Sequence, residues 1–330
     1  MTVHNVAVVG CGGVSAMHFD GYRAHPERVR VVAACDPVAE RREWAEREHG
    51  VPRTFASIED MLGHGGWDVA VLCTPSEIRE AAVSALAGAG KHILAEKPLS
   101  DGYDEAGRLV AMCRKAGVTL AVNQNFRDHY AFGIAARLIA AGEIGSVLGI
   151  SHRDLMFRQD RGWRIRMRRH AMSVMGVHWL DGFRQLTGCP ATRVSARAYS
   201  SPAIDCAGET DAFVQIEFGA IPVSYVQSFS SRVTTTETIV LGDRGTLRFG
   251  YGTLTRIAGD ETAEWDNPHV GQGKPESTYA SLSRLLDAIE TDGQPSNSGQ
   301  DNLQTIALLE AAYRSAREGR AIELRKGLPR

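Results

Sequence analysis

The sequence predicts an α/β protein with a doubly wound parallel sheet at the N-terminus, followed by an α+β domain with an open, mainly antiparallel sheet. Three observations support this fold class. A glycine-rich turn follows the first apolar run. Short apolar runs then alternate with helix-compatible stretches up to residue 123. Beyond that residue, strand-like runs follow one another with few helical stretches between them.

The composition is that of a globular protein. The 330 residues suffice for two domains, expected at 1–123 and 124–330. Charged residues make up 23% and the net charge is -2, which gives no electrostatic case for a nucleic-acid partner. No membrane-span-length apolar stretch and no signal-peptide pattern is found, so a cytoplasmic location without a membrane partner is expected. The six scattered cysteines predict reduced thiols and no metal site.

The elements of the first domain follow from the alternation of apolar runs. The expected strands are short and apolar on both faces, as buried parallel strands are. Right-handed crossovers join such strands into a sheet that binds ligands at the carboxyl ends of its strands. The strands are expected at 6–9, 29–35, 69–73, 92–95 and 119–122, and the helices at 14–24, 38–49, 79–89 and 102–117.

The turn after the first strand has the features of a dinucleotide site. Gly10 permits a tight turn, Gly12 lets the backbone approach a pyrophosphate, and the next helix offers its N-terminal N–H groups to the phosphates. Asp36 closes the second strand, where a carboxylate accepts hydrogen bonds from ribose hydroxyls and repels the 2′-phosphate of NADP. NAD is therefore the expected cofactor and NADP is disfavoured, although Arg41 and Arg42 lie one turn further on. The expected contacts in the turn are Gly10, Gly12, Gly13 and Val14.

A lysine stands at the carboxyl edge of the predicted sheet. The strand at 92–95 is followed by Glu96-Lys97-Pro98, so Lys97 lies where the nicotinamide half of a cofactor is expected. An ammonium there can donate a hydrogen bond to a substrate hydroxyl or carbonyl oxygen, and partial desolvation lowers the pKa of a lysine toward a working range. The alternative is a surface lysine whose charged end reaches water.

The second domain is predicted from runs of strands. Helices are expected at 129–141, 173–187, 279–290 and 302–317, and strands at 192–199, 210–218, 221–229, 234–241, 245–249 and 321–324. Successive strands without intervening helices favour antiparallel pairing.

A series of motifs in this order resembles the oxidoreductase family named for glucose-fructose oxidoreductase, inositol dehydrogenase and a rhizopine-catabolism protein (the Gfo/Idh/MocA family). The resemblance covers the whole chain. It implies an N-terminal Rossmann domain, a C-terminal sheet that often forms the interface of a homodimer or homotetramer, and hydride transfer at a secondary alcohol or ketone of a sugar or cyclitol. The motifs are Gly10-Cys11-Gly12-Gly13 with His18, Cys73-Thr74-Pro75, Gly90-Lys91-His92, Glu96-Lys97-Pro98, Gly142-Glu143-Ile144-Gly145, Gly176-Val177-His178-Trp179-Leu180-Asp181 and Ser315-Ala316-Arg317-Glu318-Gly319-Arg320.

The resemblance also implies roles for individual residues. It makes Lys97 and His178 catalytic, and a histidine suits proton exchange with a hydroxyl because its pKa lies near neutrality. The further cofactor contacts that we expect are Thr74, Pro75, Glu96, Lys97, Trp163 and Arg164. The expected substrate contacts are Lys97, Arg127, Arg164, His178 and Asp181.

Two positions depart from the family pattern. Many members carry an aspartate four residues before the histidine, on the same helix face, and this chain has Val174 there. Asp181 lies three residues after His178 and either orients the imidazole from the other side or makes a structural hydrogen bond. Arg79 stands where the family often has histidine, which puts the detailed cofactor contacts in doubt rather than the fold.

A segment rich in arginine precedes the helix of His178. Arginine forks match carboxylates and phosphates, so an anionic substrate such as a sugar acid or sugar phosphate is one hypothesis. A solvated loop or a subunit contact is the other. The seven arginines are Arg153, Arg158, Arg161, Arg164, Arg166, Arg168 and Arg169.

The function that these features favour is an NAD-dependent dehydrogenase or reductase of a polyhydroxylated substrate. One alternative is an NAD-dependent glycosidase on the same scaffold, in which transient oxidation drives elimination. Another is a non-catalytic nicotinamide-binding or regulatory protein, for which the missing carboxylate at Val174 is the best support.

Overall fold

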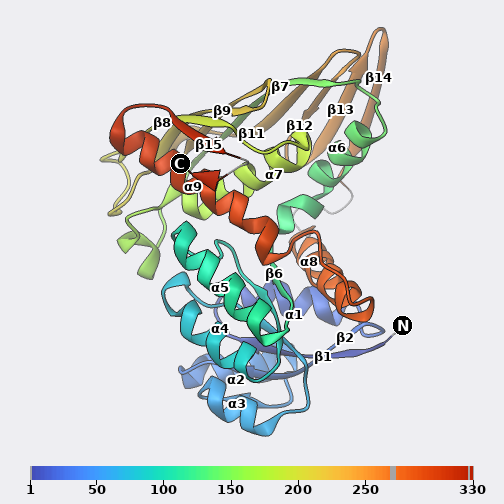
Figure 1. Ribbon diagram of the computed structural model, residues 1–330, viewed down its shortest axis with the longest axis vertical. Coiled ribbons are helices and arrows are strands. Elements are labelled where there is room, and N and C mark those ends of the chain that lie inside the picture. The colour runs from blue at the N-terminus through green and yellow to red at the C-terminus, as the bar shows by residue number, and fades with distance from the viewer. Residues whose placement is uncertain (1, 268–272, 326–327, 330) are drawn as a thin grey trace. The chain divides into compact units, whose positions relative to one another are not determined.

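The computed structural model describes residues 2–267, 273–325 and 328–329, and the chain forms two compact units (Figure 1). The first unit comprises Met1–Asn125 and Gly271–Leu303, and the second comprises Phe126–Val270 and Gln304–Arg330. The expected division at 123/124 left out this return of the chain to the first unit. The return has a physical reason, because Leu282 and Leu286 of helix α8 (Gly273–Glu290) are buried in the same apolar core as Val8 of the first strand.

The first unit holds a six-stranded sheet in the order β3-β2-β1-β4-β5-β6, and all its strand pairs are parallel. This confirms the doubly wound sheet. The strand order reverses between β1 and β4, and ligands of such sheets bind outside the carboxyl ends of the strands at this point. The strands are β1 (His4–Val9), β2 (Val29–Cys35), β3 (Thr54–Phe55), β4 (Val69–Leu72), β5 (His92–Ala95) and β6 (Leu120–Val122).

Helices connect these strands and cover the sheet. Strand β4 is apolar and fully buried along its whole length, so it needs helices on both faces of the sheet. Helix α5 carries a buried apolar face formed by Ala106, Leu109 and Cys113, which recur at helical spacing. The sequence did not predict β3 or α3, because β3 has only two residues. The connecting helices are α1 (Ser15–Arg23), α2 (Ala39–His49), α3 (Ile58–His64), α4 (Arg79–Gly88) and α5 (Tyr103–Ala116).

The second unit is built on a ten-stranded sheet in the order β14-β13-β12-β11-β7-β10-β9-β8-β15-β16. Among the described strands, β7 and β10 form the single parallel pair, so the sheet is mainly antiparallel, as expected. The strands are β7 (Val147–Phe157), β8 (Arg193–Tyr199), β9 (Asp211–Phe218), β10 (Ile221–Ser228), β11 (Ser230–Gly242), β12 (Thr246–Phe249), β13 (Thr253–Ala258), β14 (Glu261–Asp266), β15 (Ile322–Arg325) and β16 (Leu328–Pro329).

Strand β7 lies in the middle of this sheet, yet the sequence did not predict it. Its core-facing positions include His152 and Asp154, which are buried polar residues and interrupt the apolar alternation by which strands are recognised. Both bond to threonines of the neighbouring strand: Thr238 Oγ1 lies 2.8 Å from His152 Nδ1, and the Thr236 hydroxyl donates to Asp154 Oδ1 at 2.7 Å. Strands β13, β14 and β16 were also missed, and β14 is a largely exposed, polar edge strand.

One face of the large sheet is covered by helices α6 (Tyr130–Ala140) and α7 (Val177–Thr187) (Figure 1). Phe183 of α7 packs in one core with Val214 of β9 and Tyr225 of β10, and all three are fully buried. Helix α9 (Gly299–Glu318) adds Leu308 and Ala312 to this core. Alternate residues of β8 and β9 are exposed, so among the described residues the opposite face of the sheet is uncovered at these strands.

The described residues offer neither a membrane-spanning helix nor a metal-binding cluster. They contain no helix with the length and apolar character needed to cross a membrane. Nor do the residues in the described ranges form a group of three or more histidine, cysteine or acidic side chains that could hold a metal ion. The six cysteines are free thiols, and four of them are buried.

Candidate active site

The glycine-rich turn connects β1 to α1 and has open space in front of it. Gly10 has a φ of 93°, and a Cβ there would lie 2.8 Å from the carbonyl oxygen of Cys73, so the position requires glycine. A Cβ at Gly12 or Gly13 would meet no atom within 4 Å. The Ser15 hydroxyl, in place of the third glycine, donates to the Gly12 carbonyl at 2.6 Å and braces the turn. The turn and the N-terminus of α1 therefore fit a pyrophosphate.

Asp36, at the end of β2, is buried and holds the glycine-rich turn. Its Oδ2 accepts the N–H of Cys11 and its Oδ1 accepts the N–H of Val38, both at 2.9 Å. Two arginines of helix α2 lie close to Asp36. Arg41 Nη1 lies 3.6 Å from Asp36 Oδ2, and Arg42 Nη1 donates to the Asp36 carbonyl oxygen at 2.7 Å. The carboxylate expected to contact ribose thus has two cations beside it.

Lys97 follows β5, and the carboxylate of Glu96 lies beneath it in the interior. Glu96 Oε1 accepts hydrogen bonds from His18 Nε2 at 2.9 Å and from Asn123 Nδ2 at 2.6 Å, and Oε2 accepts the N–H of Lys97 at 3.1 Å. The other nitrogen of His18 lies 2.7 Å from the hydroxyl of Tyr22. Both Glu96 oxygens are thus used inside the protein, which favours a role in holding the lysine turn over direct cofactor contact.

The charge state of Glu96 follows from these contacts. Burial raises the pKa of this carboxyl group, but the hydrogen bonds from His18 and Asn123 and the charge of Lys97 outweigh burial and lower the pKa to about 2. Glu96 is therefore ionised at neutral pH, and its negative charge lies next to the backbone of Lys97.

Arg79, the first residue of α4, points into the protein. Its guanidinium donates to the carbonyl oxygens of Glu96 at 2.7 Å and Leu99 at 3.1 Å, and also to those of Pro98 and Thr74. The side chain is 1% exposed. The hydrogen-bond acceptors of Arg79 are thus backbone carbonyls of the protein itself, and one of them belongs to Thr74, an expected cofactor contact. Thr74 and Pro75 follow β4, at the carboxyl edge of the sheet.

His178 lies in the second unit, in the first turn of α7, and is 5% exposed. Its imidazole stacks on Phe126, with ring centroids 3.9 Å apart and planes inclined by 14°. The neighbouring Trp179 donates from Nε1 to Asp154 Oδ2 at 3.1 Å, which fixes this end of the helix to strand β7. The helix is therefore anchored on both sides of the imidazole.

The segment before α7 is held by a carboxylate that the sequence did not indicate. Glu209 accepts the N–H groups of His170 and Met172, each at 2.9 Å, and the hydroxyl of Tyr313 at 2.7 Å. The same hydroxyl accepts the N–H of Ser173 at 3.1 Å. No local spacing could reveal this arrangement, because Glu209 and Tyr313 are far from His178 in the sequence.

Asp181 is engaged by other residues of the second unit. Arg127 donates to it from Nε at 2.6 Å and from Nη2 at 2.7 Å, and the Thr305 hydroxyl donates at 2.7 Å. Arg184 adds a contact at 3.3 Å, and the carboxylate is 1% exposed. Of the two alternatives for Asp181, these contacts favour structural hydrogen bonding. They likewise favour a bracing role for Arg127 over a substrate contact.

The arginine-rich segment does not form a single loop. Arg153 lies within β7 and pairs with Glu237 of β11 at 2.7 Å, and Arg158 pairs with Asp160 at 3.0 Å. Trp163 and Arg164 lie on a short 3-10 helix (Gly162–Arg166), where the Arg164 guanidinium is 5.3 Å from the centre of the indole ring. Within the described part of the chain, no ion pair is formed by Arg161, Arg164, Arg166 or Arg168.

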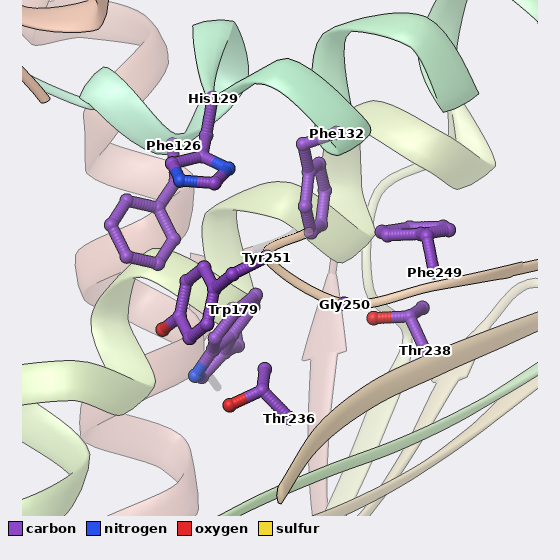
Figure 2. A pocket seen from close by; sticks show the side chains of 9 residues that line it. All are labelled: Phe126, His129, Phe132, Trp179, Thr236, Thr238, Phe249, Gly250 and Tyr251. Atoms are coloured by element: carbon purple, nitrogen blue, oxygen red, sulfur yellow. The ribbon is translucent and has the colours of Figure 1, made fainter. Parts of the chain in front are cut away.

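Figure 2 shows a small aromatic pocket in the second unit. Phe126, whose ring stacks on His178, forms one wall. The Thr236 and Thr238 hydroxyls are already bonded to Asp154 and His152. The small volume of the pocket and the internal bonding of its two threonine hydroxyls argue against a substrate site there. Its lining residues are Phe126, His129, Phe132, Trp179, Thr236, Thr238, Phe249, Gly250 and Tyr251.

Comparison with known families agrees with this architecture. Residues 4–124 match the NAD-binding Rossmann fold of an oxidoreductase family, and residues 136–324 match the C-terminal alpha/beta domain of the same family. The chain belongs to the Gfo/Idh/MocA oxidoreductase family. The resemblance read from the sequence motifs is thereby confirmed.

Individual members of the family are enzymes acting on sugars. The chain is 30% identical to D-apiose dehydrogenase of Paraburkholderia graminis, over 97% of this chain and 89% of that protein. It is 27% identical to 1,5-anhydro-D-fructose reductase of Ensifer adhaerens, over 90% and 92%. Among solved structures, the WlbA dehydrogenase of Bordetella pertussis in complex with NADH and UDP-GlcNAcA has a TM-score of 0.83 at 27% identity, covering 98% of both chains. The protein is thus an oxidoreductase with an NAD-binding fold and sugar dehydrogenases and reductases as relatives.

The family position occupied by Val174 has a structural explanation in this chain. The expectation that it lies one turn from His178 on the same face assumed an α-helix, but Met172–Gly176 is π-helical. A π-helix bonds residues five apart rather than four, so the spacing rule of an α-helix does not apply from Val174 to His178. Val174 packs with Ala171 and Phe229 in a small apolar cluster. An apolar side chain suits this environment.

Proposed function

We propose that this protein is an NAD-dependent dehydrogenase or reductase that transfers a hydride between nicotinamide and a secondary alcohol or ketone of a sugar, cyclitol or related polyol. The observation that carries this proposal is the position of Lys97 at the carboxyl end of β5, in a Rossmann sheet whose glycine-rich turn and Asp36 fit a dinucleotide. Family membership and the sugar-specific relatives support the same reaction.

The residues that would hold the cofactor are those of the turn and of the second strand. Gly12 and Gly13 leave room for the pyrophosphate at the N-terminus of α1, and Asp36 accepts the ribose hydroxyls. When bound, the nicotinamide supplies hydride chemistry. We propose NAD rather than NADP, because the Asp36 carboxylate repels a 2′-phosphate.

In this proposal Lys97 and His178 both act on the substrate oxygen, Lys97 as a hydrogen-bond donor and His178 as a proton acceptor. Lys97 donates a hydrogen bond to that oxygen and stabilises the negative charge that develops on it. During oxidation, His178 accepts the hydroxyl proton while the carbon loses its hydride, and it returns the proton during reduction. The stacked ring of Phe126 holds the imidazole plane for this exchange.

An anionic sugar is the more specific substrate hypothesis. Arg161, Arg164, Arg166 and Arg168 lie close together in the sequence, and no carboxylate in the described parts of the chain forms an ion pair with them. Arginine forks bind carboxylates and phosphates in two-point contacts. The solved WlbA dehydrogenase, whose bound UDP-GlcNAcA is anionic, shows that a relative accommodates such a ligand.

We further propose that the uncovered face of the large sheet forms a homodimer or homotetramer interface. Phe213 of β9 and Tyr199 of β8 stack there with ring centroids 6.3 Å apart, although they are 49% and 52% exposed. Exposed aromatic side chains on an open sheet are typical of a surface that a partner covers.

A substrate panel tests the proposed reaction. Purified protein would be incubated with NAD or NADP and with polyols, neutral sugars, sugar acids and sugar phosphates, while nicotinamide absorbance is followed. We expect reduction of NAD with at least one of these alcohols. Glycoside cleavage without net NADH formation would identify a glycosidase instead, and tight NADH binding without turnover of any compound would contradict an enzymatic role.

A further inference from the structure

We infer that Arg79 is a positioning residue, whose buried guanidinium holds the backbone on both sides of Lys97 in the conformation that presents the lysine. This inference rests on the proposed function, in which Lys97 contacts the reacting oxygen. It concerns a residue that departs from the family pattern and that contacts the lysine turn only through its backbone.

The hydrogen bonds of Arg79 join two neighbouring strand ends. Its acceptors are the carbonyl of Thr74, which follows β4, and those of Glu96, Pro98 and Leu99, which follow β5. Strands β4 and β5 are adjacent, with Leu72 opposite Ala95 at the point where both strands end. One side chain therefore ties the loop after β4 to the turn that carries Lys97.

A second buried side chain holds the same turn through a different backbone group. The Glu96 carboxylate accepts the N–H of Lys97, and His18 and Asn123 fix that carboxylate in turn. The peptide group before Lys97 is thus bound at both ends, with its carbonyl on Arg79 and its N–H on Glu96. The backbone around Lys97 is set by two buried side chains of opposite charge.

The chemistry of arginine is what allows this arrangement. A buried cation is costly unless its donors are satisfied, and no carboxylate in the described part of the chain forms an ion pair with Arg79. Backbone carbonyls supply acceptors for both Nη nitrogens of Arg79. Nη1 donates to the three carbonyls that follow β5 and Nη2 donates to the Thr74 carbonyl that follows β4, whereas the single nitrogen of a lysine cannot occupy both positions. The turn conformation and the burial of Arg79 therefore depend on each other.

The test compares two buried arginines of the first unit. Arg79→Lys keeps the positive charge but removes the forked guanidinium group. Arg28→Lys is the matched control, because Arg28 is 6% exposed and pairs with Asp287 at 2.6 Å and Glu290 at 2.9 Å, outside the lysine turn. Both variants should lower Tm. Only Arg79→Lys should change the environment of Lys97.

The main readout does not require turnover. The chain has five lysines, so acetylation of each can be followed by mass spectrometry as a function of pH, with the exposed Lys115 as the internal reference. We expect Arg79→Lys to change the acetylation rate of Lys97 relative to Lys115 by about threefold or more, which corresponds to about half a pKa unit. Arg28→Lys should leave that ratio unchanged. If Arg79→Lys does not fold, Arg79→Gln removes the buried charge and serves the same comparison.

Kinetics then add a second readout on a verified substrate. Arg79→Lys should lower kcat about tenfold or more, since small displacements of a catalytic group are costly, while KM for NAD stays within about twofold. An unchanged Lys97 acetylation ratio in a folded Arg79 variant overturns the inference, as does an equal change in Arg28→Lys. Failure of the wild-type protein to turn over any compound overturns the proposed function instead, and the acetylation comparison still decides the positioning role.

Discussion

Phe126 and His178 lie face to face, with their rings 3.9 Å apart and nearly parallel. The next residue, Arg127, binds Asp181 with two hydrogen bonds, and Asp181 is three residues beyond His178 on helix α7. The dipeptide Phe126-Arg127 therefore holds α7 at two points on neighbouring turns. An aromatic ring from outside the helix thus lies flat against the imidazole, and Val174 stands where many family members carry a carboxylate.

The proposed catalytic pair predicts large losses of rate. Lys97→Ala and His178→Ala should each lower kcat by about 10²- to 10⁴-fold, the usual effect of removing one well-placed polar catalytic group. His178→Ala should also remove a pH dependence of kcat near neutrality. NADH binding, measured by fluorescence titration, should largely survive in both variants. Lys115→Ala and His64→Ala are exposed controls, and wild-type turnover by both active-site variants would disprove the assignment.

Cofactor preference is predicted from Asp36 and the arginines beside it. NADH should bind about tenfold or more tightly than NADPH, because the Asp36 carboxylate repels the 2′-phosphate. Arg41 lies 3.6 Å from that carboxylate and is 56% exposed, so Arg41→Ala should weaken NADPH binding further with little effect on folding. Titrations of both cofactors check this, with Arg47→Ala on the same helix as the control. Tighter binding of NADPH by the wild-type protein would contradict it.

If the substrate is anionic, replacing Arg164 should selectively raise KM for that substrate. Arg164→Ala should raise KM for the substrate about tenfold, the effect of losing one hydrogen bond to a charged group, with little change in NAD affinity. Added salt should also raise KM. Arg153→Ala is the control, because Arg153 pairs with Glu237 on the sheet surface. A best substrate that is uncharged, with activity insensitive to ionic strength, would end this hypothesis.

Acid stability is predicted from the buried His152. Burial lowers the pKa of this imidazole from 6.5 to about 3, so it stays neutral in the folded protein while the unfolded chain binds a proton below about pH 6.5. The unfolded state therefore binds more protons between about pH 6.5 and 3, and the free energy of unfolding falls across this window as pH falls. The slope from this group is about 1.4 kcal/mol per pH unit.

The variant His152→Gln has no imidazole at this position, so its unfolded chain does not take up the proton that His152 binds. Between pH 7 and 5, its free energy of unfolding should fall by about 2 kcal/mol less than that of the wild-type protein. Urea unfolding at the two pH values measures this difference. Replacing the exposed His64 with glutamine should leave the wild-type pH dependence in place, and an equal loss in His152→Gln and wild type would show that His152 titrates normally.

The uncovered sheet face predicts an oligomer that a single charge can disrupt. The wild-type protein should sediment as a dimer or tetramer, and Phe213→Glu should shift it toward the monomer, because a carboxylate would be buried in an apolar interface. Ile78→Glu alters a 56% exposed side chain of the first unit and should leave the mass unchanged. A monomeric wild-type protein in analytical ultracentrifugation would contradict the proposed interface.

The sequence alone determined the features that local patterns encode. Apolar runs such as 69–73 predict buried strands, because a strand covered on both faces must be apolar throughout. The glycines of the first turn and the position of Lys97 after β5 follow from the same strand assignments, and the motif order identified the family. The structure confirms the parallel sheet and the mainly antiparallel second sheet.

Tertiary structure alone decided which polar groups meet. The inward fork of Arg79, the pairing of Asp181 with Arg127 and the Glu209 contacts all join residues that are distant in sequence or separated by a turn. The sequence did not indicate strand β7 for the same reason, because His152 and Asp154 face the core and form hydrogen bonds with threonines of another strand. Hydrophobic periodicity in a sequence indicates which positions are buried, but a buried polar residue interrupts that pattern. The hydrogen-bond partner of such a residue comes from a distant part of the chain, so it is determined only by tertiary packing.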